Sequence, residues 1–252
     1  MSKNRNTPKS IAIVLLIAAC FCILNIDMSI RQGVNGRYRR IHMPLYVKSA
    51  QFIGRHHEYV RIAKEITAQS KTAEEKALAL FNWTHDNIRE VPAGMPVVDD
   101  HVLNIIIRGY GTADQSQDVF TTLCMYAALP AFWQKVYNGP HTVWYPISFV
   151  KLNGKWRVFD SYYGKYFRTA SGEIASVDDI INDSSIIDKA GVDSIIYMGV
   201  PYKEFFHQLN VVEFNKTLRP EKQIPLRRAI FEIKKLFKIE KENEEDASEV
   251  KQ

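Results

Sequence analysis

Cysteine is scarce in this chain, and the three cysteines cannot pair or bind zinc within a folded domain. Cys20 and Cys22 lie in one apolar run, which leaves Cys124 as the single cysteine of the remaining sequence. A disulfide needs two partners, and a structural zinc site needs several ligands at characteristic short spacings. The sequence therefore excludes an intradomain disulfide and a cysteine-based zinc site.

Patterns for other metals, nucleotides and nucleic acids are also missing. The seven histidines form no metal-ligand cluster, and Gly109-Tyr-Gly111 lacks the later glycine and the Lys-Ser/Thr pair of a phosphate-binding loop. The net charge of +5 is mild, and no basic groove with interleaved aromatic residues is indicated. We therefore expect no metal, no cofactor and no nucleic-acid partner.

Long apolar runs are equally rare, and the N-terminal run stands alone. It extends from Ile11 to Leu24 and follows three basic residues. It is short for a membrane-spanning helix, which needs roughly 17 to 25 residues, although Ile26 can extend it. No small-x-small cleavage site follows. We therefore predict an uncleaved membrane anchor through residues 11–26, with the domain outside the cytoplasm, periplasmic or at the cell surface.

Two other kinds of processing compete with the anchor. The segment Ile17-Ala-Ala-Cys20 resembles the lipobox of bacterial lipoproteins, in which the cysteine is acylated. A cleaved secretion signal is the third outcome. Basic residues lie on both sides of the run, so their distribution decides little about orientation.

The central segment predicts a helix followed by a strand pair. Two glycines, Gly109 and Gly111, permit a sharp entry into a helix whose apolar residues recur at helical spacing up to Ala128. The runs 142–152 and 155–159 are rich in β-branched and aromatic residues, and Asn153-Gly154 between them is a strong hairpin signal.

These parts resemble the transglutaminase-like superfamily of the papain-like fold. Its pattern is Gly-x-Cys at the start of a helix, a Gly-(Ile/Leu)-Pro-Ala turn, His-(Ala/Thr) opening a strand, and Trp-x-x-x-Asp closing the next. Leu129-Pro-Ala131 matches the turn, His141-Thr142 the histidine strand and Trp156-Arg-Val-Phe-Asp160 the aspartate strand. The resemblance covers roughly residues 72–167. Counting back from the turn, the position of the cysteine falls on Ala113.

The resemblance implies an α+β fold with a helix bundle packed on an antiparallel sheet. It makes His141 the base and Asp160 the residue that orients it, while Ala113 marks a lost nucleophile, whether the loss is natural or engineered. The implied function is that of a membrane-tethered pseudoenzyme that binds or scaffolds a peptide or cell-envelope polymer, or a membrane-associated protein partner. Further candidate cleft residues are Thr112, Asp114, Gln115, Ser116 and Trp144.

Three alternatives remain open. Cys124 lies about 16 Å along the same helix at ~1.5 Å per residue, too far to replace the missing thiol. Thr112 or Ser116 could instead serve as a hydroxyl nucleophile, with His141 and Asp160, in an active amide hydrolase or acyltransferase. The histidine and aspartate could also be purely structural, in an architectural subunit whose cleft is packed shut by Tyr162, Tyr163 and Trp144.

The chain divides into a membrane segment and a single globular domain with extensions. The predicted divisions are 1–30 for the anchor or signal, 31–71 for a linker and leading helices, 72–170 for the core, 171–224 for its extension, 225–241 for a basic amphipathic helix and 242–252 for a disordered acidic tail. Helices are expected over 59–69, 73–89, 99–108, 177–182 and 202–209. The amphipathic helix can pack on the domain, the commoner outcome, or lie on anionic lipid.

Overall fold

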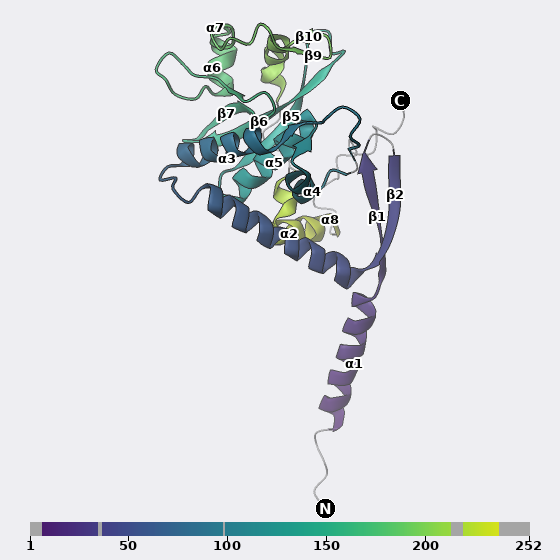
Figure 1. The fold of residues 1–252 in the computed structure, drawn as a ribbon. Coiled ribbons are helices and arrows are strands. Elements are labelled where there is room, and N and C mark those ends of the chain that lie inside the picture. Colours follow the sequence, from purple (N-terminus) through teal and green to yellow (C-terminus); the bar gives the residue numbers. More distant parts are fainter. Residues whose placement is uncertain (1–6, 35–36, 98, 213–218, 237–252) are drawn as a thin grey trace, which may run out of the picture.

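The computed structural model describes residues 7–34, 37–97, 99–212 and 219–236. A single helix, α1 (Thr7–Leu24), projects from a larger body, as Figure 1 shows. It leads into an antiparallel hairpin of β1 (Asp27–Val34) and β2 (Arg37–Pro44). The long helix α2 (Leu45–Ile66) then carries the chain into the body.

The body is built on a four-stranded antiparallel sheet. Its order is β5-β6-β7-β8, with bounds Ala131–Tyr137, Trp144–Leu152, Lys155–Asp160 and Lys165–Tyr166. The predicted hairpin between β6 and β7 is confirmed, because Asn153 and Gly154 have φ angles of 51° and 81°. Positive φ at both central residues is what a tight two-residue turn requires, and Asn-Gly tolerates it best.

Helices cover both faces of this sheet. α5 (Ala113–Tyr126) lies against β5 and β6, and α2, α3 (Ala73–Asn87) and α4 (Val102–Arg108) pack around it. Alternate strand residues divide between two cores: Val150 and Phe159 join the helical side, whereas Phe149 and Val158 join the opposite side. This alternation is the period of two expected of a strand buried on both faces. The predicted α+β arrangement of helices on an antiparallel sheet is confirmed.

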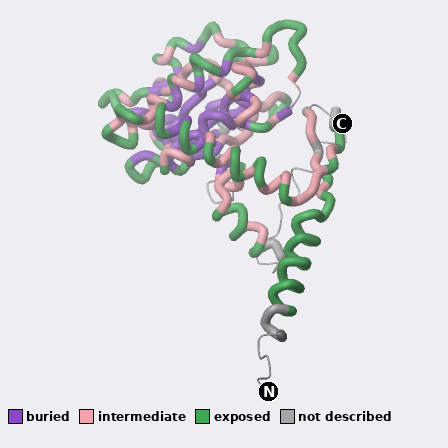
Figure 2. Tube along the Cα trace, turned by 60° about the horizontal axis from the view of Figure 1, so that its bottom comes forward, coloured by how far each residue is buried: buried purple, intermediate pink, exposed green. Residues whose placement is uncertain are grey.

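The second face is covered by short elements from the C-terminal part of the chain. They are α6 (Val177–Asn182), α7 (Ser185–Asp188) and the 3₁₀ helix η1 (Tyr202–Val211). The helices predicted over 177–182 and 202–209 are both present, the second as a 3₁₀ helix that extends to Val211. Figure 2 shows the buried residues concentrated in the body, away from α1.

Local signals located some helix ends and missed others. The capping box at α3 is present: Glu75 N–H donates to Thr72 Oγ1 at 3.1 Å, and Thr72 N–H donates to Glu75 Oε2 at 3.2 Å. In contrast, α2 begins at Leu45 rather than Tyr59, directly after Pro44. The first half of α2 has no buried residue, so its apolar stripe was too weak to predict a helix.

The start of α4 is also corrected, from Asp99 to Val102. The Asp99 carboxylate accepts the N–H of His101 at 3.0 Å, which forms an Asx turn and delays the helix. The remaining elements are two short strand pairs, a short 3₁₀ helix and the C-terminal helix. They comprise β3 (Arg89–Glu90), β4 (Tyr110–Gly111), β9 (Ile196–Tyr197), β10 (Val200–Pro201), η2 (Glu221–Gln223) and α8 (Pro225–Leu236). The expected end of the amphipathic helix at 237–241 and the acidic tail 242–252 lie outside the described residues.

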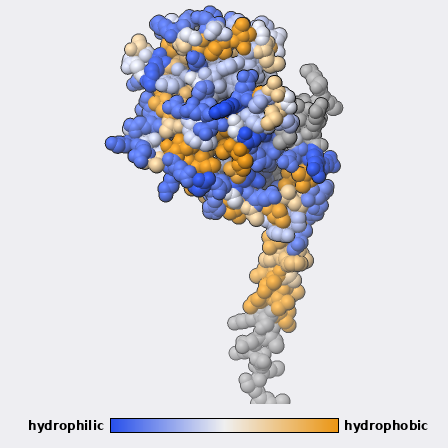
Figure 3. All heavy atoms as spheres, viewed as in Figure 1, coloured by the Kyte–Doolittle hydropathy of each residue, from blue (hydrophilic) through white to orange (hydrophobic). Residues whose placement is uncertain are grey.

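α1 presents apolar side chains to solvent on all sides. Residues from Ile11 to Leu24 are all exposed, and Leu16 and Phe21 expose 65% and 68% of their surface. In Figure 3 these side chains form an orange column below the mostly blue body. In the described part of the chain, no helix combines the length and apolarity needed to cross a membrane.

Candidate functional site

Ala113 is the first residue of α5, at the end of the glycine-containing entry. Gly109 ends α4 in the left-handed conformation, with φ of 71°, and a Cβ at Gly111 would lie 3.0 Å from the side chain of Gln115. The two glycines therefore allow the turn from α4 into α5. The Ala113 methyl is 4% exposed and belongs to the same apolar cluster as Tyr145.

Asp160 closes β7, as predicted, and its carboxylate is completely buried. Tyr202 Oη donates to Oδ2 at 2.6 Å, and Tyr145 Oη approaches both oxygens at 2.9 and 3.1 Å. Gln117 Nε2 adds a bond of 2.7 Å to Oδ1. The N–H groups of Tyr162 and Tyr163 donate to Oδ1 at 3.0 and 3.3 Å. Burial raises the pKa of Asp160, and the hydrogen bonds to its carboxylate oppose that rise.

His141 lies in the loop before β6 rather than on the strand. It has a left-handed φ of 57°, and its ring stacks on Tyr137 with a centroid distance of 5.4 Å. The side chain of Asn138 accepts the N–H groups of Thr142 and Val143, which holds this loop and delays the strand to Trp144. The described hydrogen bonds of Asp160 include none from His141. Among the described residues, the predicted base and its orienting residue are therefore not hydrogen-bonded to each other.

Tyr145 is the β6 side chain that reaches Asp160. The Asn-Gly turn sets Ser148 opposite Phe159, so Tyr145 and Asp160 share the other face of the sheet. A diagonal neighbour on the same face is within reach of a long aromatic side chain. Sequence reasoning missed this pair, although the hairpin register could have identified it.

Neither candidate hydroxyl has a hydrogen bond to a histidine ring within the described residues. Thr112 Oγ1 donates to Asp114 at 2.5 Å. Ser116 is completely buried, and its Oγ shares a hydrogen bond of 2.9 Å with Ser161 Oγ. Cys124 is also buried, which raises its thiol pKa well above the ordinary value. In the described part of the chain, none of these three groups is hydrogen-bonded to an imidazole, the usual partner of an activated hydroxyl or thiol.

Aromatic rings surround the Tyr145 hydroxyl. The ring of Tyr145 lies 4.7 to 5.7 Å from those of Tyr163, Tyr197, Tyr202 and Phe205. Burial raises the pKa of both Tyr145 and Tyr202 well above the ordinary tyrosine value. We call Tyr145, Tyr163, Tyr197, Tyr202 and Phe205 the aromatic seal, because the other four rings pack around that of Tyr145, whose hydroxyl contacts the Asp160 carboxylate.

Of the other residues expected to close a cleft, Tyr162 joins this cluster and Trp144 makes a different contact. Tyr162 packs edge-on against Tyr163 at 5.0 Å. Trp144 is half-buried, and the ammonium group of Lys135 lies 4.5 Å from its ring centroid. Trp144 is therefore part of a cation–π pair at the start of β6.

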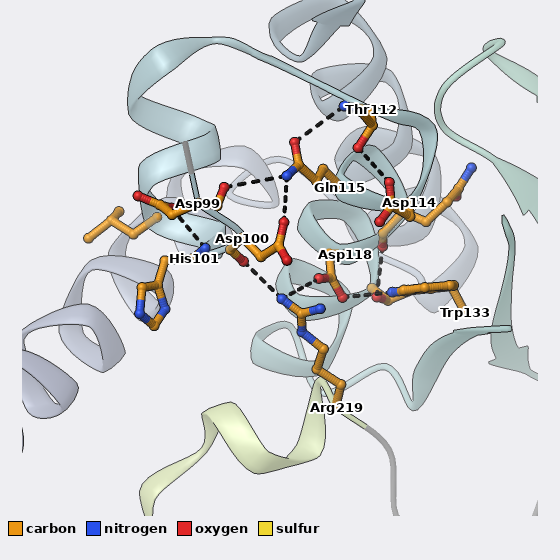
Figure 4. Close-up of polar contacts among 12 residues, drawn as sticks. Asp99, Asp100, His101, Thr112, Asp114, Gln115, Asp118, Trp133 and Arg219 are labelled. Atoms are coloured by element: carbon orange, nitrogen blue, oxygen red, sulfur yellow. Dashed lines mark hydrogen bonds and ion pairs between the residues drawn. The ribbon is translucent and has the colours of Figure 1, made fainter. Parts of the chain in front are cut away.

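A second polar cluster lies along α5 and was not predicted (Figure 4). Arg219 Nη2 approaches the buried Asp118 carboxylate at 2.9 Å, and Trp133 Nε1 donates to it at 2.6 Å. The Gln115 amide donates to Asp100 at 2.6 Å, beside the Asp100 carbonyl that accepts from Arg219. Burial raises the pKa of Asp118 to about 6, and the positive charge of Arg219 lowers it in part.

Among the described residues, no group of acidic, histidine or cysteine side chains is arranged to hold a metal ion.

Comparison with known proteins gives distant structural matches only. No family model and no curated protein matches the sequence. A "putative cysteine protease" from Cytophaga hutchinsonii aligns with 15% identity and a TM-score of 0.38, over 49% of this chain and 44% of that one. A "putative protease" from Parabacteroides distasonis aligns with 14% identity and a TM-score of 0.36, over 53% and 35%.

A third solved structure, of a TGase, aligns with 14% identity and a TM-score of 0.35, over 64% of this chain and 49% of that one. The aligned region thus spans less than half of each of the three proteins. The chain has a distant structural similarity to proteins described as cysteine proteases and a transglutaminase.

Proposed function

We propose that this protein is a noncatalytic, membrane-tethered domain of transglutaminase-like fold that binds or scaffolds a peptide or cell-envelope polymer. One observation carries the proposal. The hydroxyl groups of Tyr145 and Tyr202 donate hydrogen bonds to the Asp160 carboxylate, and the position of the expected nucleophile holds the buried methyl group of Ala113.

The chemistry of these groups is unsuited to amide cleavage or acyl transfer. Such reactions need a nucleophile hydrogen-bonded to a base that can take its proton. Tyr145 is neutral, because burial raises its pKa well above the ordinary value, and its hydroxyl proton is directed at Asp160. It therefore acts as a donor. A neutral tyrosine and an alanine methyl cannot replace an imidazole and a thiol.

The tether is supported by α1. Its apolar part, Ile11–Leu24, extends about 21 Å at ~1.5 Å per residue, which is shorter than the roughly 30 Å bilayer core but long enough to insert into it. Exposed apolar side chains on every side of a helix are unfavourable in water and favourable in hydrocarbon. We therefore place α1 in lipid and the body at the membrane surface, outside the cytoplasm.

Covalent labelling tests the loss of catalysis. We expect a hydroxyl-directed probe such as a fluorophosphonate to leave Thr112 and Ser116 unmodified in the wild-type protein. Ala113→Cys combined with Tyr145→His would place a thiol at the start of α5 and an imidazole beside Asp160, and Ala113→Cys alone is its matched control. Labelling of Thr112 or Ser116 that disappears in His141→Ala would refute the proposal and establish the active amide hydrolase or acyltransferase.

Fractionation and sedimentation test the tether and the ligand. We expect the full chain to stay with membranes after alkaline carbonate extraction, and Leu16→Lys with Ile17→Lys to release it. The matched control is Ile196→Lys, an apolar residue in the body that is also exposed. Binding to an insoluble cell-wall polymer is measured by co-sedimentation. If neither that polymer nor peptides derived from it bind, the ligand assignment fails while the tether stands.

A further inference from the structure

α8 leaves its apolar stripe uncovered. Leu226, Ile230 and Ile233 recur at the spacing of one helix face and expose 71%, 47% and 53% of their surfaces. No described residue of α8 is buried. Packing on the domain, the outcome favoured from the sequence, is therefore not the role of this stripe.

Basic residues flank the stripe. The sequence of α8 holds two arginines and two lysines against one glutamate, a net charge of +3. Arg227 pairs with Glu221 at 2.7 Å, and Arg228 pairs with Glu232 at 2.5 Å, so part of this charge is balanced locally. Lys222 and Arg228 also lie over the ring of Phe231, at 4.3 and 5.8 Å. Phe231 thus faces basic groups, while the aliphatic stripe faces outward.

The position of α8 relates it to α1. α8 contacts α2, and α2 in turn contacts α1. Figure 1 shows α8 beside α2, on the side of the body from which α1 projects. β9 and β10 lie at the opposite end in Figure 1, and they carry Ile196 with a comparable exposed fraction of 64%.

We propose that α8 is an interfacial helix that binds the surface of an anionic bilayer beside α1. An amphipathic helix with a basic polar face lies in the headgroup region, with its aliphatic residues among the acyl chains and its cations among anionic lipids. The inference extends the proposed tether: α1 holds the domain at the membrane, and α8 fixes which end of the domain faces it.

Hydrogen exchange on the full chain in vesicles tests this orientation. The vesicles contain phosphatidylcholine alone or a mixture with phosphatidylglycerol. We expect the amides of α8 to become protected in the anionic vesicles, and Ile230→Asp to abolish that protection. Ile196→Asp, at the other end of the body, is the matched control and should leave it unchanged. Arg227→Ala with Arg228→Ala should weaken binding of α8 to the anionic vesicles by roughly 25-fold, because each basic residue near an anionic surface contributes about fivefold.

Carbonate extraction of the same samples separates this inference from the tether. Protein that resists extraction while α8 exchanges freely refutes the α8 inference and leaves the tether intact. Protein that binds only anionic vesicles and is removed by carbonate, with α8 protected, supports α8 and refutes the tether. Equal protection of α8 without vesicles means that a second copy of the chain covers the stripe, which refutes binding to lipid. Failure to bind any vesicle refutes both.

Discussion

Replacing Asp118 with asparagine should remove a pH dependence of stability that the wild-type protein carries. The pKa of this carboxyl is raised from 3.8 to about 6 by burial in the folded state. The folded protein therefore binds more protons than the unfolded chain between about pH 4 and pH 6. The free energy of unfolding falls as pH rises through this window, and the penalty is complete above pH 6.

The size of the effect follows from the shift. A rise of about two pKa units corresponds to about 3 kcal/mol of unfolding free energy, at ~1.4 kcal/mol per unit. The asparagine side chain in Asp118→Asn would keep an oxygen for Trp133 Nε1 but could not ionise, so the variant lacks this contribution. The stability of the wild type relative to Asp118→Asn should therefore fall by about 3 kcal/mol between pH 4 and pH 7.

The assay is urea unfolding followed by circular dichroism at a series of pH values. Asp86→Asn, at an exposed position on α3, is the matched control and should follow the wild type. Arg219 lowers the pKa of Asp118, so Arg219→Ala should move the transition to higher pH. A constant difference between wild type and Asp118→Asn from pH 4 to pH 7 would show that the carboxyl is not desolvated, and would refute the reasoning.

Three further predictions concern packing and turns, and each is read by chemical denaturation. Tyr145→Phe and Tyr202→Phe should each cost about 1.5 to 3 kcal/mol and be non-additive, because both hydroxyls donate to Asp160; additive losses below about 0.5 kcal/mol would contradict this. Gly154→Ala should cost about 1 kcal/mol at a φ of 81°, whereas Gly139→Ala, where no atom lies within 4 Å, should be nearly neutral. Thr72→Ala should cost about 1 kcal/mol by removing the α3 cap, and an unchanged midpoint would argue against that cap.

Features set by neighbouring residues were predictable from the sequence. The α3 capping box and the Asn153-Gly154 hairpin depend on side chains a few residues apart, and both are confirmed. The order of helix, turn and strand pair likewise identified α5 and Asp160 as the parts that meet at the site. Local chemistry fixes these elements because their hydrogen bonds close within one turn.

Features set by tertiary contacts were not predictable in the same way. A motif match selected His141, but the Asn138 side chain holds the loop and delays β6, so Tyr145 reaches Asp160 instead. The partner of Asp118 is Arg219, far along the chain, and no sequence spacing relates the two. Both differences arise where a side chain finds its partner on another element.

Asp160 has a structural role that explains its presence without catalysis. Its carboxylate joins three elements: Gln117 donates from α5, Tyr145 from β6 and Tyr202 from η1. A buried carboxylate requires such donors, because a buried carboxylate oxygen without a donor destabilises the fold by more free energy than one hydrogen bond contributes. Asp160 therefore links the sheet, α5 and η1 through hydrogen bonds to one buried carboxylate.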